Sequence, residues 1–318
     1  MQDQFSFRDA AVNTQRAADE ILFRKAEEGG ILLGKDRWMF TKLFTVDDAT
    51  EKQLNKNIAA VSEFAANHPG KVTFLLAPSA SVIYPEKLPA GTPMVDENAM
   101  LDEIFAKVGQ SAGIIDLREL FAARKDEYLY FKTDHHWTPN GAYRAYEAFC
   151  AQKGLTPFDR DAHESATVTG FEGTHYSATR LWNVQDDTIT YYPLDNLMTI
   201  YKITGEAAYE PERTENLINA DKFATRDKYA AFLDGNNGYS TIEGNGTGSI
   251  LVVKDSYANS FVPYLTTNYA AIDVVDFRNY NYGLDQLIAD NDYDAILVLY
   301  SYSSFTSDPY LYRAGVAG

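Results

Sequence analysis

The feature that most constrains the fold is a set of short apolar runs separated by longer stretches with helical periodicity. The apolar runs lie at 72–77, 113–117, 249–253, 271–277 and 295–300, and the helical patterns lie at 50–67, 95–108, 139–152 and 283–290. Buried strands that alternate with helices are typical of a parallel sheet covered on both faces. The sequence therefore predicts an α/β fold with three layers, an α/β/α sandwich.

The stretch 155–247 has a different character. Its short alternating runs, such as 188–192 and 198–201, are separated by turn signals such as Asn236-Asn237-Gly238. We expect a mainly β, antiparallel insertion there. Residues 8–28 show an amphipathic helical pattern, so 1–30 is predicted to be an N-terminal helical segment. The whole chain, 1–318, is then one domain.

Charge and cysteine content exclude several classes of protein. The formal net charge of −17 repels phosphate backbones, which argues against nucleic-acid binding. Cys150 is the one cysteine, so no internal disulfide forms. No apolar run reaches the roughly 18 residues of a membrane-spanning helix, and polar residues directly after Met1 do not resemble a signal peptide. The 22 tyrosines fit either a carbohydrate site or a β-rich core.

Two polar strings lie where a parallel sheet places its binding sites, beyond the carboxyl ends of the strands. The first is Thr133-Asp134-His135-His136-Trp137-Thr138, just before the proline that starts a predicted helix. A histidine oriented by an aspartate is suited to act as a general base. The alternative is a helix cap whose histidines form only local hydrogen bonds.

The second string, Lys254-Asp255-Ser256-Tyr257, directly follows an apolar run. A serine at a strand-to-helix turn is presented at the sheet edge, where backbone N–H groups can face a developing oxyanion. Asp and Ser are also common helix caps, so this string alone is weak. Arg278 follows another strand and either enters the same cleft or lies on the surface.

Two glycine-rich motifs are interpreted as ordinary turns. Gly109-Gln110-Ser111-Ala112-Gly113 matches G-x-S-x-G, but a helix precedes it and a strand follows, the reverse of a nucleophile elbow. Gly244-Asn245-Gly246-Thr247-Gly248 precedes a strand and is therefore no dinucleotide loop.

A metal site is the weaker alternative for the first string. Asp134, His135 and His136 are possible ligands, with His163 or His175 as a further one. Adjacent residues of an extended chain point to opposite faces, so we do not expect both histidines of the string to reach one ion. We predict neither a metal nor another cofactor.

The two strings resemble those of the bacterial DHHW proteins, which are similar to the SGNH-like domains of alginate O-acetyltransferase proteins. Further resembling pieces extend over nearly the whole chain: Gln4-Phe5-Ser6-Phe7-Arg8-Asp9, Gly34-Lys35-Asp36-Arg37-Trp38-Met39-Phe40, Gly141-Ala142-Tyr143, Phe171-Glu172-Gly173-Thr174-His175-Tyr176-Ser177, Ser256 to Pro263, and Asp276-Phe277-Arg278.

This resemblance implies a catalytic triad in which Ser256 is the nucleophile, His136 the base and Asp134 the orienting acid. The order is permuted relative to ordinary SGNH hydrolases, whose glycine and asparagine blocks are not evident here. Residues expected to contact substrate or oxyanion are the Ser256 backbone N–H and Tyr257, Asn259, Arg278, His135, Trp137 and Tyr176.

The implied activity is transfer of an acyl group, with acetyl expected, to a cell-surface polysaccharide, or hydrolysis of such an ester. The implied partners are the glycan and a membrane-bound O-acyltransferase as acyl donor. The implied location is the cell surface, with an anchor ahead of residue 1. The alternative function is a non-catalytic glycan-binding or scaffold protein of the envelope.

Overall fold

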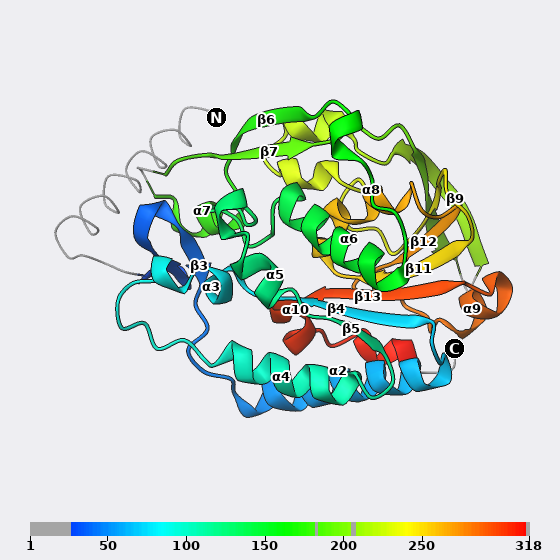
Figure 1. Cartoon of the computed structure of the whole chain (residues 1–318), viewed down its shortest axis with the longest axis horizontal. Coiled ribbons are helices and arrows are strands. Elements are labelled where there is room, and N and C mark those ends of the chain that lie inside the picture. Colours follow the sequence, from blue (N-terminus) through cyan, green and yellow to red (C-terminus); the bar gives the residue numbers. More distant parts are fainter. Residues whose placement is uncertain (1–26, 182–183, 205–207, 316–318) are drawn as a thin grey trace.

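A mixed eight-stranded sheet forms the centre of the molecule. The computed structural model describes residues 27–181, 184–204 and 208–315 (Figure 1). The strand order across the sheet is β5 (Gly113–Ile115), β4 (Val72–Ala77), β13 (Ala295–Ser301), β11 (Ser249–Lys254), β12 (Ala271–Val275), β10 (Tyr239–Glu243), β8 (Leu197–Thr204) and β9 (Ala208–Asn216). The first five strands are parallel, and the last three are antiparallel to their neighbours.

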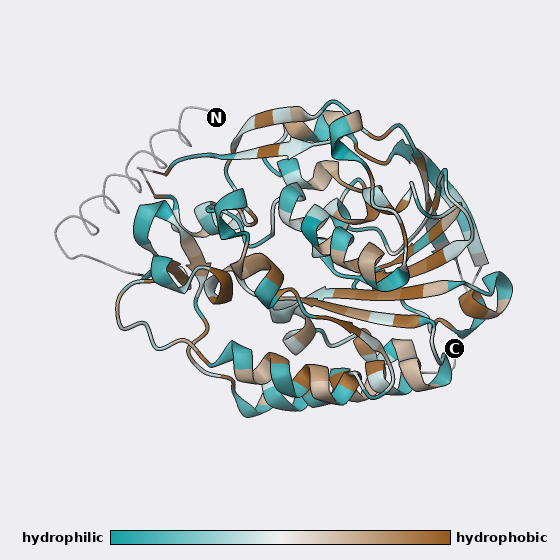
Figure 2. Ribbon diagram, in the orientation of Figure 1, coloured by the Kyte–Doolittle hydropathy of each residue, from teal (hydrophilic) through white to brown (hydrophobic). Residues whose placement is uncertain are grey.

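Alternate residues of the central strands enter two different cores. In β4, Leu75 packs on one face and Phe74 on the other, and β11 divides Val252 and Val253 in the same way. Because strand side chains alternate in direction, an unbroken apolar run needs cover on both faces. Figure 2 shows these central strands as the most hydrophobic part of the ribbon.

Helices supply that cover on each side. The helices of one face are α2 (Asp48–Asn67), α4 (Glu97–Val108), α9 (Asp285–Asn291) and α10 (Tyr302–Ser307). The helices of the other face are α3 (Ala80–Ile83), α5 (Arg118–Ala122), α6 (Pro139–Lys153) and α8 (Val262–Leu265). The predicted α/β/α sandwich is confirmed.

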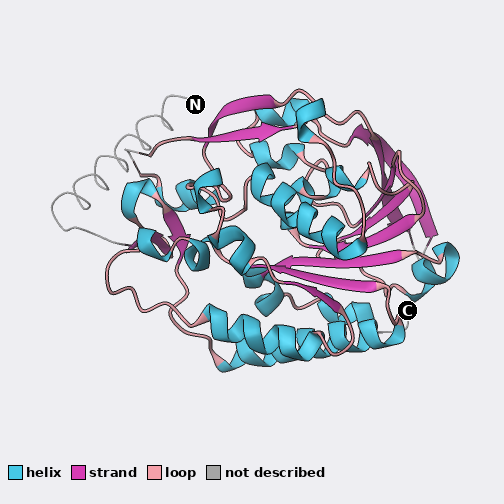
Figure 3. Ribbon diagram, viewed as in Figure 1, coloured by secondary structure: helices cyan, strands magenta, loops and turns pink. Residues whose placement is uncertain are grey.

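The β-rich stretch 155–247 is antiparallel, as expected, but it does not form one separate sheet. Strands β8, β9 and β10 extend the central sheet beyond β12, while β6 (Ala166–Phe171) and β7 (Asp187–Tyr191) pair apart from it (Figure 3). Between β6 and β7 lies the short helix α7 (Thr174–Thr179). A further three-stranded sheet contains β1 (Glu27–Glu28), β2 (Ile31–Leu33) and β3 (Met39–Thr41).

Short 3₁₀ helices connect these elements. They are η1 (Lys35–Arg37), η2 (Pro85–Lys87), η3 (Lys125–Glu127), η4 (Arg160–Ala162), η5 (Ala220–Ala224), η6 (Lys228–Ala231), η7 (Ser256–Ser260) and η8 (Leu311–Gly315). The Ser111 motif lies between α4 and β5, and the glycine motif at 244–248 lies just before β11, so both are the predicted turns. The predicted helix over 8–28 falls outside the described residues up to 26, and 27–28 form β1. In the described part of the chain, no helix combines the length and apolarity that crossing a membrane requires.

One edge of the sheet collects polar residues. Ser79 follows β4, Ser256 follows β11, Asp276 follows β12, and Ser301 ends β13. Because these strands are parallel neighbours, their carboxyl ends lie together. The loop before α6 meets this edge, and that helix begins as predicted, with Pro139 in its first turn and Thr138 as its cap.

Candidate active site

Ser256 lies at the turn between β11 and the 3₁₀ helix η7, and it is only 9% exposed. The preceding residue, Asp255, holds this turn. Its Oδ1 accepts the Tyr257 backbone N–H at 2.8 Å, and its Oδ2 accepts the backbone N–H and the hydroxyl of Ser301 at 2.8 and 2.7 Å. Because Ser301 belongs to β13, Asp255 ties the serine turn to the neighbouring strand.

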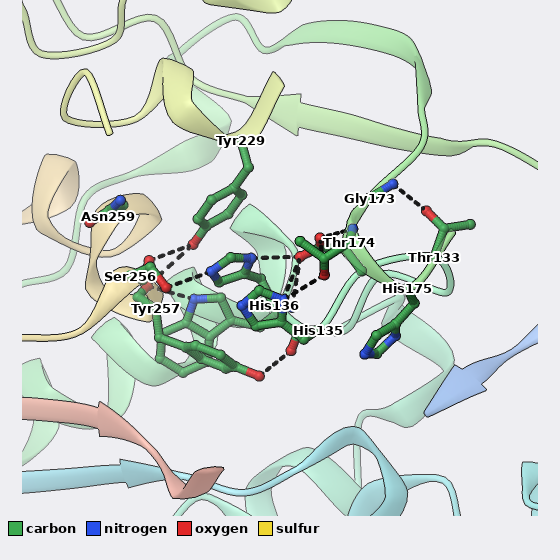
Figure 4. A network of polar contacts seen from close by, with 12 residues as sticks. Thr133, His135, His136, Gly173, Thr174, His175, Tyr229, Ser256, Tyr257 and Asn259 are labelled. Carbon is green, nitrogen blue, oxygen red and sulfur yellow. Dashed lines mark hydrogen bonds and ion pairs between the residues drawn. The ribbon is translucent and has the colours of Figure 1, made fainter. Parts of the chain in front are cut away.

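His136 reaches this serine from the loop before α6. Its Nε2 lies 2.8 Å from Ser256 Oγ, and its Nδ1 lies 2.5 Å from Asp134 Oδ1 (Figure 4). The two ring nitrogens therefore join one hydroxyl and one carboxylate. With the proton on Nδ1, Nε2 is free to accept the serine proton.

The Asp134 carboxylate is buried and accepts several hydrogen bonds. Oδ1 also accepts the His136 backbone N–H at 2.9 Å, while Oδ2 accepts the backbone N–H and hydroxyl of Thr174 at 2.7 and 2.9 Å. Burial opposes its charge, but His136, His135 and these hydrogen bonds hold the pKa of Asp134 well below its usual value. The carboxylate is thus ionised at neutral pH.

Gly173 allows Thr174 to approach the Asp134 carboxylate within hydrogen-bond distance. A Cβ on Gly173 would lie 2.3 Å from the Asp134 Cβ and 2.5 Å from Oδ2. Any side chain at position 173 would displace the carboxylate. The segment between β6 and β7 therefore completes the surroundings of the aspartate.

Asp187, at the start of β7, fixes the loop that carries the aspartate and histidine. Its Oδ1 accepts the Lys132 backbone N–H at 3.0 Å and the Tyr128 hydroxyl. Its Oδ2 accepts the backbone N–H and hydroxyl of Thr133 at 2.7 and 2.5 Å. Asp187 is 3% exposed, so these donors depend on it rather than on water.

Tyr229, from η6, covers His136. The two rings stack with centroids 4.0 Å apart and an interplanar angle of 15°. The Tyr229 hydroxyl donates to the Ser256 carbonyl at 3.1 Å and lies 3.0 Å from Ser260 Oγ. Tyr229 therefore contacts both the histidine and the serine turn, and its position restricts the movement of the imidazole.

Two of the residues expected to contact a substrate are buried and form hydrogen bonds within the protein. Trp137 is fully buried and donates from Nε1 to the Tyr257 carbonyl at 2.9 Å, so it links the two strings and has no surface for a ligand. Asn259 is 1% exposed. Its Nδ2 donates to the Gly235 carbonyl and to Asn236, and its Oδ1 accepts from Lys254. These contacts contradict a free oxyanion donor at Asn259.

The remaining candidates surround the site. Arg278 binds Asp276 through Nε and Nη2 at 2.8 and 2.5 Å while its side chain stays 37% exposed. Tyr257 donates its hydroxyl to the His135 carbonyl. Tyr176 is half-buried, and its backbone N–H donates to the Thr133 carbonyl. Among the described residues, no acceptor contacts the Ser256 backbone N–H, which leaves this group available to an oxyanion.

The two histidines of the first string do not point to opposite faces, and that expectation is wrong. Their ring centroids lie 3.9 Å apart, because the loop forms consecutive bends instead of an extended strand. Asp134, His135 and His136 offer ligand atoms within 4.8 Å of one another. However, both ring nitrogens of His136 already have partners, so a metal ion there would replace the contact to Ser256. His163 lies elsewhere and contacts Phe158 and Asp159.

Comparison with known proteins places the chain in a family. The family model described as DHHW protein matches residues 92–275, more than half of the chain. The chain belongs to the DHHW family. A DHHW family protein from Eubacterium siraeum has a similar structure, with a TM-score of 0.76 and 25% identity over 90% of this chain and 95% of that one.

Two further relatives extend the comparison for this DHHW protein. Bacillus cereus PatB1, solved with a sulfonyl adduct, has a TM-score of 0.68 and 21% identity over 89% of this chain and 97% of that one, which shows a common fold. The probable alginate O-acetylase AlgJ of Pseudomonas aeruginosa is 27% identical over 201 residues, 61% of this chain and 49% of that protein. The chain spans about half the length of the curated relatives it matches.

Proposed function

We propose that this DHHW protein transfers an acyl group through a covalent intermediate on Ser256. The observation that carries the proposal is the continuous contact from Ser256 Oγ to His136 Nε2 at 2.8 Å and from His136 Nδ1 to Asp134 at 2.5 Å. A protein that only binds glycans has no need of this alignment. A nucleophile, a base and an orienting acid within hydrogen-bond reach are the geometric requirement for acyl transfer.

The first half of the reaction acylates the serine. Ser256 Oγ attacks the carbonyl carbon of the acyl donor while its proton passes to His136 Nε2. The resulting imidazolium is stabilised by the Asp134 carboxylate, and the Ser256 backbone N–H faces the developing oxyanion. When the tetrahedral intermediate collapses, His136 returns the proton to the leaving group and the acyl-Ser256 ester remains.

The second half transfers the acyl group to an acceptor. A hydroxyl of the acceptor gives its proton to His136 Nε2 and attacks the acyl carbonyl, and Ser256 leaves with that proton. A sugar hydroxyl as acceptor gives an O-acyl transferase, whereas water gives an esterase. We favour transfer of an acetyl group to a cell-surface polysaccharide, because the curated relatives are named probable alginate O-acetylases.

The proposal extends to the setting of the reaction. A cell-surface location and a membrane-bound O-acyltransferase as acyl donor follow from the resemblance to alginate O-acetyltransferase proteins. Residues 1–318 act in this proposal as one SGNH-like domain, with 155–247 as the β-rich insertion. In the described part of that insertion, Thr174, Asp187 and Tyr229 support the triad.

Active-site labelling tests the proposal. A fluorophosphonate or a sulfonyl fluoride is expected to modify the intact protein once, and peptide mapping is expected to place the modification on Ser256. Ser256→Ala and His136→Ala are expected to lose labelling, while the exposed control Ser165→Ala keeps it. Undiminished ester turnover by Ser256→Ala would refute the proposal.

A further inference from the structure

A pocket of about 250 Å³ opens beside the triad, on the side of His135 and Tyr257. His135 connects it to the catalytic centre, because its ring lies 3.9 Å from that of His136. Tyr257 directly follows Ser256 in the chain and forms part of the pocket wall. The volume is below the roughly 300–1,000 Å³ of sites for drug-sized ligands, so it suits a smaller group such as one sugar ring.

The pocket is rich in hydroxyl groups. Serine and threonine side chains from the segment after β4, from α3, from the end of β13 and from α10 line it: Ser79, Ser81, Ser301, Ser303, Thr306 and Ser307. Phe40, Leu43 and Met94 add an apolar surface. Hydroxyl groups and apolar side chains in one pocket match the two kinds of surface that a pyranose ring presents.

Two buried polar side chains, Glu97 and His175, belong to the pocket wall. Glu97 is 5% exposed, and its Oε1 accepts a hydrogen bond from the Ser79 backbone N–H at 2.7 Å. His175 is equally buried, with Nε2 3.0 Å from Thr41 Oγ1, and its ring also interacts with the Met39 backbone. A carboxyl group in the pocket wall, such as that of Glu97, can accept a hydrogen bond from a sugar hydroxyl.

The pocket offers no positive charge to an acidic sugar. No lysine or arginine belongs to the described residues that line it. Burial lowers the pKa of His175 to about 4 and also lowers that of His135, so both imidazoles are neutral at pH 7. Arg278 acts on His135 electrostatically, but its guanidinium is paired with Asp276. Because burial raises the pKa of Glu97 to about 7, a uronate carboxylate would meet an ionised Glu97 above that pH, without a counter-charge.

We propose that this pocket binds one uncharged pyranose ring of the acceptor glycan and so directs acyl transfer to neutral polysaccharides rather than polyuronates. The proposal rests on acyl transfer through Ser256, and it names the class of acceptor. It separates this chain from the relatives named as alginate O-acetylases, since alginate is a polymer of uronic acids. The net charge of −17 acts in the same direction, because it repels a polyanionic chain.

The test measures how acetyl-Ser256 partitions between water and a sugar. p-Nitrophenyl acetate supplies the acetyl group to the full chain, and cellotetraose, chitotetraose and tetramannuronate are offered as acceptors. The ratio of transfer to hydrolysis does not depend on how much acyl-enzyme forms, so it separates the pocket from the triad. We expect at least one neutral tetrasaccharide to exceed tetramannuronate at least about tenfold.

Two variants and one control complete the design. Ser303 is exposed at the pocket, and Ser303→Trp is expected to lower the ratio for the neutral acceptor at least about tenfold. Ser165→Trp, an exposed serine outside the pocket lining, is expected to leave it unchanged. At pH 8, above the pKa of about 7 that burial gives Glu97, Glu97→Gln removes the carboxylate charge and is expected to narrow the preference against tetramannuronate.

Each outcome bears on one proposal. Equal use of the acidic and neutral acceptors, or a Ser303→Trp ratio equal to wild type, would overturn the pocket assignment while acyl transfer stands. If Ser256 is not acetylated at all, acyl transfer fails, and calorimetry with the same tetrasaccharides then tests the pocket directly. Binding of a neutral tetrasaccharide that Ser303→Trp weakens supports the pocket; no binding to the wild-type protein at millimolar concentration overturns it.

Discussion

Asp187→Asn tests whether the loop of the triad depends on one distant carboxylate. Asp187 accepts hydrogen bonds from Lys132, Thr133 and Tyr128 through two oxygens. An asparagine keeps one oxygen as acceptor, but its NH₂ group replaces the other and, depending on its orientation, faces the backbone N–H of Lys132 or of Thr133. One buried donor is then left without an acceptor.

The expected losses of stability and of activity in Asp187→Asn follow from these hydrogen bonds. A buried donor without a partner costs about 1–3 kcal/mol, which lowers the melting temperature by roughly 1.5–5 °C in a chain of this size. Lys132 and Thr133 directly precede Asp134, so the repelled backbone also shifts the Asp134 carboxylate. A displacement near 1 Å reduces catalysis by up to about 100-fold. We therefore expect a loss of about 10- to 100-fold in the acylation rate.

The assay is the burst of p-nitrophenolate from p-nitrophenyl acetate, measured at 20 to 25 °C, well below unfolding, together with a thermal melt. Asp186→Asn is the matched control, since it makes the same change at the adjacent, exposed residue. We expect the control to stay within about twofold of wild type. Wild-type burst rates and melting temperature in Asp187→Asn would refute the role given to Asp187.

Three further outcomes are expected. Gly173→Ala places a methyl group 2.3 Å from the Asp134 Cβ and should slow ester turnover at least about 100-fold. The control Gly113→Ala should not slow turnover, because the nearest atom there is a flexible amide at 3.3 Å. Equal turnover by the two variants would contradict the close approach of Gly173 to Asp134. Tyr229→Phe keeps the stacked ring but removes the hydroxyl bond to the serine turn, so acylation should slow about tenfold, and an unchanged burst would show that the hydroxyl is dispensable. Burial raises the pKa of Glu97 to about 7, so this residue's contribution to stability is fully present below its unfolded pKa near 4.5 and is lost as pH rises through about 7. In urea unfolding at pH 5 and pH 8, the free energy of unfolding of Glu97→Gln should gain up to about 3 kcal/mol relative to wild type at the higher pH. The same difference between variant and wild type at both pH values would contradict the pKa shift.

The sheet and its edge could be predicted from local patterns. Apolar runs such as 72–77 and 249–253 are long enough for one strand and carry no polar face, so they identify β4 and β11 without other information. The rule that parallel strands place sites at their carboxyl ends then brings Ser256 toward the loop of His136. Pro139 and Thr138 mark the start of α6 by ordinary capping chemistry.

The support of the triad could not be predicted in the same way. Asp187 contacts residues 54 and 55 positions away, and Thr174 contacts Asp134 across 40 positions. No local periodicity encodes such pairs. The stretch containing Gly173 and Thr174 resembles the family, and this resemblance could have marked it as part of the site. Nothing in the sequence around Tyr229 indicates that its ring covers His136.

The bends of the 131–137 loop could not be predicted from the sequence either. The argument that adjacent histidines point apart assumes extended backbone, and the loop is held instead by side-chain acceptors from the β-rich stretch. The same limit applies to β8 and β10: their alternation predicts strands, but their pairing with β12 depends on long-range register.

The most direct measurement of the central claim is the mass of the protein after brief exposure to p-nitrophenyl acetate and an acid quench. Acetyl transfer through the serine predicts one added acetyl group of about 42 Da, mapped to the peptide that contains Ser256 and released again when acceptor or water is allowed to react. Ser256→Ala and His136→Ala should show no such adduct. An acetyl group on another residue, or full ester turnover without an adduct on Ser256, would contradict the account.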